Sequence, residues 1–145
     1  MSLTFLGEYS VAEVITPIAV ALVFITLMSA VKEPMRRSLM AIIVAGAGAA
    51  YISGGGMGGW EFAFTALMAV CSYQGLASYR FTGIAWLLHT GWDAVHHLAG
   101  HPIIPFYATS SLGCAICDPV IALWCFAGAS PVFSWFRRRA AIPVP

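Results

Sequence analysis

Charged residues are scarce in this sequence. Only 9% of the 145 residues are Asp, Glu, Lys or Arg, whereas 60% are hydrophobic, and a soluble domain usually carries about 25% charged residues. This shortage excludes an ordinary water-soluble fold. The net charge is +1, and no basic stripe is present that would follow a phosphate backbone, so nucleic acid is not an expected partner.

The signatures of several enzyme classes are also missing. No G-x-S-x-G turn surrounds Ser110 and Ser111, so a membrane serine hydrolase is not favoured. A single histidine-rich segment cannot supply the repeated histidine boxes of membrane di-iron oxygenases. The glycine run at residues 54–59 has no Lys-Ser/Thr after it and no strand before it, which disfavours a phosphate-binding loop.

Long apolar stretches dominate what is present. They cover residues 11–31, 38–53, 60–76, 82–98 and 112–135. A membrane-spanning helix needs about 17–25 residues, so interfacial residues must complete the two short stretches. We therefore predict an all-α membrane protein, in which residues 1–145 form a single domain of about five transmembrane helices surrounded by lipid.

The basic residues indicate how this bundle is oriented. All of them follow the first, third or fifth stretch: Lys32, Arg36, Arg37, Arg80, Arg137, Arg138 and Arg139. Five spans put all of these residues on one face of the membrane, and the positive-inside rule makes that face cytoplasmic. The N-terminus is then outside and the C-terminus is cytoplasmic.

The pair Asp118-Pro119 offers another interpretation of the last stretch. Asp is a favoured N-cap, and Pro is favoured at the first helical position. A helix from this point to Phe136 would rise about 27 Å, which is enough to cross the hydrocarbon. Residues 102–117 would then form an outer loop or re-entrant turn, and this is the version that we favour.

Small residues are concentrated in the second stretch. Residues 45–50 read Ala-Gly-Ala-Gly-Ala-Ala. In lipid, small residues at helical spacing let two helix backbones approach closely. We expect this face to pack against another helix, or against a second copy of the chain in a homo-oligomer.

The densest polar segment is residues 89–101, and it holds every histidine of the chain: His89, His96, His97 and His101. At about 100° per residue, His89, Asp93 and His96 fall within about 60° of one another on a helix. Imidazole and carboxylate ligands suit a divalent metal such as Zn²⁺ or Fe²⁺. Because His89 and His96 are about two turns apart, the expected primary set is Asp93 with one of them, completed from other helices. His97 and His101 are alternate ligands.

Carboxylates from other spans are expected to join this segment. Glu61 begins the third span and Asp118 begins the fifth, so both lie toward the outer face with Asp93. Ionisable groups near hydrocarbon normally face a partner or a wet cavity. We therefore predict a shared site in which Asp93, Glu61 and Asp118 are catalytic, with Glu61 or Asp118 transferring protons. The structural alternative makes Asp118 an N-cap, Glu61 a response to the helix dipole and the histidines interfacial.

Cys114 and Cys117 form a C-x-x-C pair near the outer end. Such a pair can be a redox dithiol, a disulfide, half of a thiolate metal site or two small packing residues. A second C-x-x-C is absent, which excludes a Cys₄ zinc site within one chain.

Four stretches of the sequence are distinctive in combination. They are residues 44–51, 59–64, 86–97 and 113–119, which read VAGAGAAY, GWEFAF, WLLHTGWDAVHH and GCAICDP. Together they resemble DUF6010, a family of small bacterial membrane proteins of unknown function. The resemblance covers nearly the whole chain and implies an integral protein of the bacterial inner (plasma) membrane, but it implies no activity.

The function expected from these residues is that of a membrane-embedded, metal-dependent enzyme acting on a lipid or another apolar small molecule near the outer face. The same Asp and His residues could instead form the relay of a proton-coupled carrier. That reading is second, because the inner half offers little beyond Ser72, Tyr73 and Gln74. A third reading is a non-catalytic subunit of a larger membrane complex.

Overall fold

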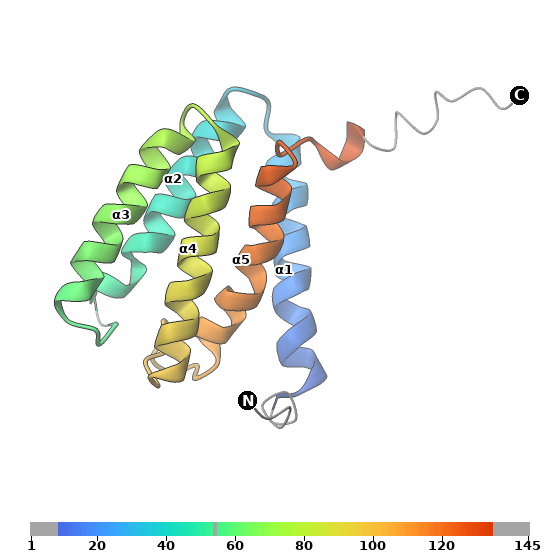
Figure 1. The fold of residues 1–145 in the computed structure, drawn as a ribbon. Coiled ribbons are helices and arrows are strands. Elements are labelled where there is room, and N and C mark those ends of the chain that lie inside the picture. Colours follow the sequence, from blue (N-terminus) through green and yellow to red (C-terminus); the bar gives the residue numbers. More distant parts are fainter. Residues whose placement is uncertain (1–8, 54, 135–145) are drawn as a thin grey trace, which may run out of the picture.

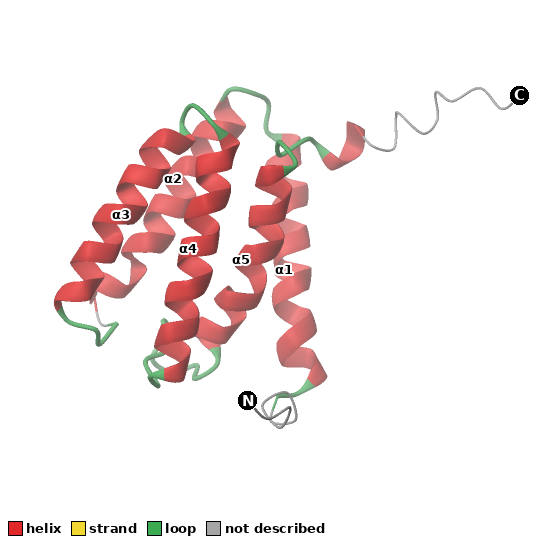
Figure 2. Ribbon diagram, in the orientation of Figure 1, coloured by secondary structure: helices red, strands yellow, loops and turns green. Residues whose placement is uncertain are grey.

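The computed structural model describes residues 9–53 and 55–134, and its regular elements in this part of the chain are all helical (Figure 2). The elements are α1 (Val11–Ala30), α2 (Met35–Ala49), the 3-10 turn η2 (Ala50–Ser53), α3 (Gly59–Gly75), α4 (Tyr79–Leu98) and α5 (Ser110–Phe126). No strand occurs among the described residues. The predicted all-α class is confirmed.

The helices run alternately up and down, so that consecutive connections lie at opposite ends of the bundle (Figure 1). α4 is central, because it packs on α2, α3 and most extensively on α5. α1 packs mainly against α5, and α2 packs mainly against α3. This arrangement makes the faces of α4 and α5 the natural place for a buried site.

The start of α1 is explained by local capping. The Ser10 hydroxyl accepts a hydrogen bond from the Glu13 backbone N–H at 3.3 Å, and Oε2 of Glu13 accepts one from the Ser10 backbone N–H at 2.8 Å. This reciprocal pair is a capping box, which satisfies two backbone donors that a helix end leaves free. Glu13 therefore has a structural role.

The start of α5 contradicts the interpretation that we favoured. The helix begins at Ser110 and contains Pro119, so Asp118 is not an N-cap and residues 110–117 are not a loop. Pro119 lacks the N–H that would bond the carbonyl of Ala115. The loss of one backbone hydrogen bond costs less free energy than the packing of the whole helix on α4 provides. For this reason the Asp-Pro pair does not mark the start of the helix.

The end of α5 also differs from the prediction. The helix ends at Phe126, followed by Gly128 with φ of 83°, whereas the predicted span continued to Trp135. A positive φ is a conformation that glycine adopts at little cost, and it commonly terminates a helix. Trp135 and Phe136 lie outside the described residues.

Two helical segments are long and apolar enough to cross a membrane by length and composition, Val11–Ala30 and Met35–Ser53. Ser110–Phe126 is apolar but shorter. The expected small-residue packing is confirmed at Gly48 in α2, where a Cβ would lie 2.5 Å from Cβ of Met68 on α3. At Gly46 a Cβ would meet no atom within 4 Å.

The described basic residues gather at one end of the bundle, where α1 joins α2 and α3 joins α4 (Figure 1). They are Lys32, Arg36, Arg37 and Arg80. We call this the basic end and the opposite one the site end. Residues 137–139, which hold the other three arginines, lie outside the described residues.

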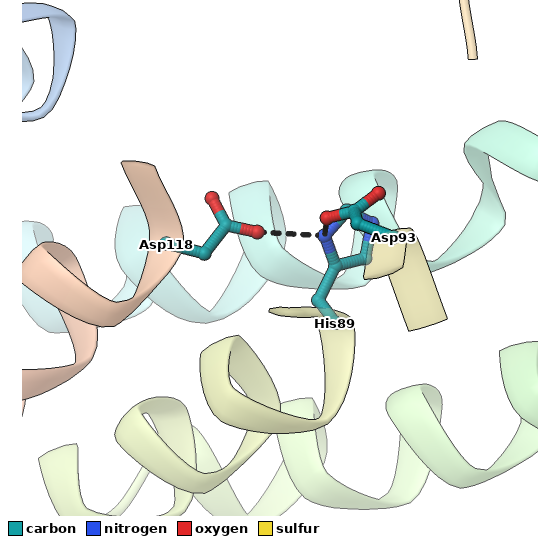
Figure 3. A group of neighbouring side chains, drawn as sticks. All are labelled: His89, Asp93 and Asp118. Carbon is teal, nitrogen blue, oxygen red and sulfur yellow. Dashed lines mark hydrogen bonds and ion pairs between the residues drawn. The ribbon is translucent and has the colours of Figure 1, made fainter. Parts of the chain in front are cut away.

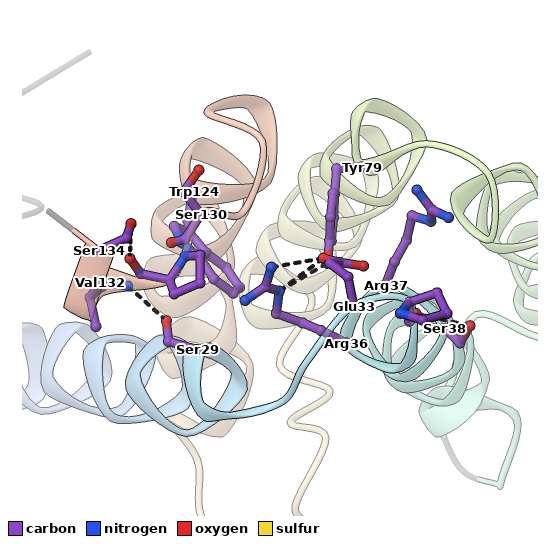
Figure 4. A network of polar contacts seen from close by, with 12 residues as sticks. Ser29, Glu33, Arg36, Arg37, Ser38, Tyr79, Trp124, Ser130, Val132 and Ser134 are labelled. Carbon is purple, nitrogen blue, oxygen red and sulfur yellow. Dashed lines mark hydrogen bonds and ion pairs between the residues drawn. The ribbon is translucent and has the colours of Figure 1, made fainter.

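A polar network closes the basic end (Figure 4). Arg36, only 5% exposed, donates to Oε1 of Glu33 at 2.8 Å and to the Tyr79 hydroxyl at 3.2 Å, and that hydroxyl donates to Glu33 at 2.6 Å. Partial burial raises the pKa of Glu33, but hydrogen bonds from Tyr79 and Arg36 outweigh it and hold that pKa below its ordinary value. The network ties the α1–α2 connection to the start of α4.

Candidate functional site

His89 on α4 lies between two carboxylates (Figure 3). Its Nδ1 is 2.7 Å from Oδ2 of Asp118 on α5 and 2.8 Å from Oδ2 of Asp93, one turn further along α4. His89, Asp93 and Asp118 are 2%, 0% and 4% exposed. The i, i+4 spacing puts His89 and Asp93 on one helix face, and the packing of α5 on that face brings in Asp118.

The other ring nitrogen of His89 fixes where the ring carries a proton. Nε2 is 2.9 Å from the carbonyl oxygen of Ala47 in α2. A carbonyl oxygen can only accept, so Nε2 is protonated and donates. Nδ1 then carries either a lone pair or a hydrogen atom. It is aligned with Asp118, and Oδ2 of Asp93 accepts no hydrogen bond from the described residues although it is close to Nδ1.

Two carboxylates around one imidazole place negative charge in a buried site. A lone pair on Nδ1 cannot remain 2.7 Å from a carboxylate oxygen unless a proton or a cation lies between them. Ligand atoms of His89, Asp93 and Asp118 lie within 4.8 Å of one another. The group can therefore hold either a shared proton or a metal ion.

Tyr51 in η2 holds the second oxygen of Asp93. The Tyr51 hydroxyl donates to Oδ1 of Asp93 at 2.6 Å and is 2.8 Å from Oγ of Ser111 on α5. Because a phenol has one proton, Ser111 must be the donor in the second contact. Oγ of Ser111 also accepts from the Ile103 backbone N–H at 2.9 Å. This chain of hydrogen bonds connects Asp93 to the loop before α5.

Glu61 and His96 form a second buried pair. Oε1 of Glu61 is 2.9 Å from Nε2 of His96, while Oε2 accepts from Trp92 Nε1 at 3.2 Å. Oε1 also accepts from the Met57 backbone N–H at 3.1 Å, and Nδ1 of His96 is 2.9 Å from the Trp92 carbonyl. Every polar atom of this pair has a partner. The helix dipole alone does not account for Glu61.

Tyr51 joins the two groups. Its ring stacks on His96 with centroids 3.8 Å apart and an interplanar angle of 26°, while its hydroxyl bonds Asp93. A displacement of Tyr51 would therefore disturb both groups at once.

The structure does not bring His97 into the site. Nε2 of His97 is 2.8 Å from the Tyr9 hydroxyl, and His101 is exposed at the end of the bundle. Cys114 and Cys117 are free, half-buried thiols. Cys117 packs against the apolar core, whereas Cys114 lies three residues after Ser111 and four before Asp118, on the α5 face that carries the site.

A small pocket of about 100 Å³ opens at the site end of the bundle. It is lined by Ala50, Tyr51, Ser53, Gly55, Pro102, Ile103 and Pro105. Tyr51 belongs to the pocket wall and also bonds Asp93. A molecule bound in the pocket would therefore contact Tyr51, whose hydroxyl is bonded to a buried carboxylate.

Sequence reasoning missed Tyr51, Ser111 and the carbonyl of Ala47. Tyr51 had a usable signal, because it is a lone hydroxyl-bearing aromatic residue directly after a run of small residues. Ser111 was considered only as a hydrolase nucleophile. The Ala47 carbonyl had no signal, because a backbone acceptor becomes visible only when α2 and α4 are packed together.

The fold and the site define an all-helical bundle with a buried His and carboxylate group that can hold a metal ion. A profile of the family of unknown function DUF6010 matches residues 12–131. The chain belongs to this family, as the four sequence stretches indicated, and the match includes all residues of the site. No curated protein and no solved structure matches the chain.

Proposed function

We propose that this protein is a membrane-embedded, metal-dependent enzyme that acts on a lipid or another apolar small molecule near the outer face. The observation that carries the proposal is the position of His89 Nδ1 between two buried carboxylates, with Nε2 held by a backbone carbonyl. A buried excess of carboxylates is costly unless a cation or proton compensates it.

His89, Asp93 and Asp118 fit the role of metal ligands. A ligating imidazole usually donates its other N–H to a carbonyl or carboxylate, as His89 does to Ala47. Tyr51 orients Asp93 in the same way from its other oxygen. One imidazole and two carboxylates suit Zn²⁺ or Fe²⁺. Such an ion would polarise a substrate oxygen or activate water when bound.

The exposed surface supports the membrane setting. In each of the five helices large apolar side chains face outward, for example Leu27, Ile42, Val70, Leu87 and Leu123, which are 46–69% exposed. The core helix of a soluble protein is mostly buried, whereas only 11% of the apolar window of α1 and 33% of that of Met35–Ser53 are buried. A lipid environment gives these surfaces a suitable solvent.

The pocket supports a substrate, or a part of one, of limited size. Its volume of about 100 Å³ is below the roughly 300–1,000 Å³ of ordinary ligand pockets, so it admits a small molecule or one end of a lipid. Tyr51 contacts both the pocket and Asp93, which makes it the residue best placed to pass a proton between them. Asp118 is connected to Asp93 through His89. Glu61 instead bonds His96, which stacks on Tyr51, and so affects the position of Tyr51.

One observation favours a second candidate function, a proton-coupled carrier. An imidazole shared by two carboxylates is also a good proton-holding group within a membrane. A non-catalytic subunit of a larger complex, or a homo-oligomer, would use a different surface. Gly46, which has no neighbour within 4 Å of a Cβ position, offers the small-residue face for such a contact.

Metal content of the detergent-purified protein tests the proposal. We expect stoichiometric metal in the wild type, and loss of it in His89→Gln, Asp93→Asn and Asp118→Asn, because each substitution removes a ligand. His97→Gln is the matched control and should retain the metal. A wild type that binds neither Zn²⁺ nor Fe²⁺ after reconstitution would overturn the metal centre and leave the proton carrier as the better reading.

A further inference from the structure

Cys114 lies on the face of α5 that carries the buried site. It follows Ser111 by three residues and precedes Asp118 by four. At about 100° per residue, it stands about 60° from Ser111 and about 40° from Asp118 around the helix. Ser111 points into the bundle, because it contacts the Tyr51 hydroxyl. Asp118 does so too, because it contacts His89, and Cys114 shares the face of both.

The register of α5 against α4 puts Cys114 level with Asp93. The two helices run in opposite directions (Figure 1), and Asp118 meets His89 at one level. Four residues further toward the site end, α4 reaches Asp93 and α5 reaches Cys114, each after a rise of about 6 Å. In keeping with this register, the carboxylate that acts most strongly on the Cys114 thiol is that of Asp93, followed by that of Asp118.

One oxygen of Asp93 has no hydrogen bond at this level. Oδ1 accepts from the Tyr51 hydroxyl at 2.6 Å, whereas Oδ2 has no hydrogen-bond partner among the described residues, although Asp93 is 0% exposed. A buried carboxylate oxygen normally has a donor or a cation next to it. Oδ2 is therefore free to bind a cation, and the Cys114 thiol lies at the same level of the helix interface.

Cys117 is placed differently, although it belongs to the same C-x-x-C pair. It stands about 100° from Asp118 around the helix, because the two residues are adjacent. Its side chain packs against the apolar core. The pair therefore offers one thiol to the site, and the second thiol provides a control.

We propose that the Cys114 thiolate is the fourth ligand of a metal ion held by His89, Asp93 and Asp118 (Figure 3). The inference rests on the proposed function, because it requires that this group binds a metal. The thiol releases its proton to solvent when the ion binds, and no electron is transferred. Cys114 is not in the group whose ligand atoms lie within 4.8 Å of one another, so binding requires its side chain to rotate about χ1 into another staggered rotamer.

Four ligands of this kind suit the charge and the geometry of Zn²⁺. A neutral imidazole, two carboxylates and one thiolate leave a net charge of about −1 on the ion and its ligands, which is a smaller excess than the charge of about −2 at a four-cysteine zinc site. The hydrogen bond from Tyr51 to Asp93 offsets part of that charge. A substrate oxygen then enters as a fifth ligand, because a zinc centre can expand to five ligands.

The thiolate also makes the site selective among divalent metals. Thiolate ligands favour Zn²⁺ and disfavour the ions that prefer oxygen ligands, such as Mg²⁺ and Mn²⁺. Two carboxylates and one imidazole discriminate less between these ions. Cys114 therefore determines which metal the site takes.

X-ray absorption spectroscopy of the zinc-loaded protein tests this ligand set directly. We expect one sulfur at about 2.3 Å from the ion, together with nitrogen and oxygen neighbours at about 2.0–2.2 Å. Wild-type protein that holds Zn²⁺ without a sulfur neighbour would overturn the proposal, and so would two sulfur neighbours. The measurement needs no substitution, so it does not depend on the folding of a variant.

Single substitutions of the two cysteines assign the sulfur to a residue. Cys114→Ser should lose the sulfur neighbour, because the thiolate is the ligand form of cysteine and a serine hydroxyl does not replace it. Its affinity for Zn²⁺ should fall on the order of tenfold or more. Cys117→Ser is the matched control and should keep both the sulfur neighbour and the affinity. Loss of the sulfur neighbour in Cys117→Ser, with its retention in Cys114→Ser, would refute the assignment.

Failure of this inference is distinguishable from failure of the proposed function. Stoichiometric Zn²⁺ bound by nitrogen and oxygen alone would refute the role of Cys114 and leave the metal centre in place. A wild type that binds no metal after reconstitution would refute the metal centre and this inference together.

Discussion

At the scale of single residues, Asp93 and Asp118 contact the same imidazole nitrogen but are held differently. Asp118 is aligned with Nδ1 of His89, while Asp93 depends on the Tyr51 hydroxyl for its hydrogen bond. Both carboxylates are almost completely buried. The position of Asp93 is therefore sensitive to one phenolic proton.

The substitution Tyr51→Phe should destabilise the protein by about 1–3 kcal/mol, because it leaves a buried carboxylate oxygen and Ser111 without their shared partner. The aromatic ring stays, so its stacking on His96 is preserved. Denaturant unfolding in detergent measures the change. Tyr73→Phe, at a residue that is 74% exposed, is the control and should lie within about 0.5 kcal/mol of the wild type. Equal stability of the two variants would show that Asp93 does not need Tyr51.

At the scale of helices, close packing of α2 on α3 sets the position of both Ala47 and Tyr51. Gly48 lies between them in the sequence and leaves no room for a side chain, since a Cβ would be 2.5 Å from Cβ of Met68. The Gly48 carbonyl also accepts from the Thr65 hydroxyl at 3.0 Å. The backbone oxygen that orients His89 thus depends on a small residue in the next position.

Gly48→Ala and Gly46→Ala make a matched pair on α2. Gly48→Ala should cost about 1–3 kcal/mol, because Met68 and the helix backbone must shift. Gly46→Ala meets no atom within 4 Å and should be neutral or stabilising by up to about 1 kcal/mol, since Ala favours helix over Gly. Thermal unfolding of both proteins checks the order. A less stable Gly46→Ala would instead indicate that this face is covered by another copy of the chain.

At the scale of the whole molecule, charge is divided between the two ends. The described Lys and Arg residues lie at the basic end, whereas Glu61 and His96 lie toward the site end and His89 and Asp118 lie near the middle of α4 and α5. If the bundle spans a membrane, the positive-inside rule makes the basic end cytoplasmic. The pocket then opens outside.

Labelling of introduced cysteines tests this orientation. Gly59→Cys, at an exposed position where a Cβ meets nothing within 4 Å, should react with an impermeant thiol reagent added to intact cells. Lys32→Cys, at the exposed α1–α2 connection, should react only after permeabilisation. Reversed access would refute the orientation and move the pocket to the cytoplasmic face.

The sequence by itself determined the helical class, the approximate bounds of the first four helices and the position of His89, Asp93 and His96 on one helix face, but it left open which histidine pairs with Asp93. Composition and apolar runs report how a segment meets its solvent, and an i, i+4 spacing fixes two side chains on one face of a helix. These are local properties. They hold whatever the neighbouring helices do.

Only the tertiary structure decided which ligands meet. His89 and His96 share a helix face, but they are about 10 Å apart along its axis, so each takes the carboxylate of the helix packed at its own level. α5 supplies Asp118 to His89, and α3 supplies Glu61 to His96. Asp118 enters the site because α5 starts two turns before Pro119, and that start depends on packing against α4 rather than on the Asp-Pro pair.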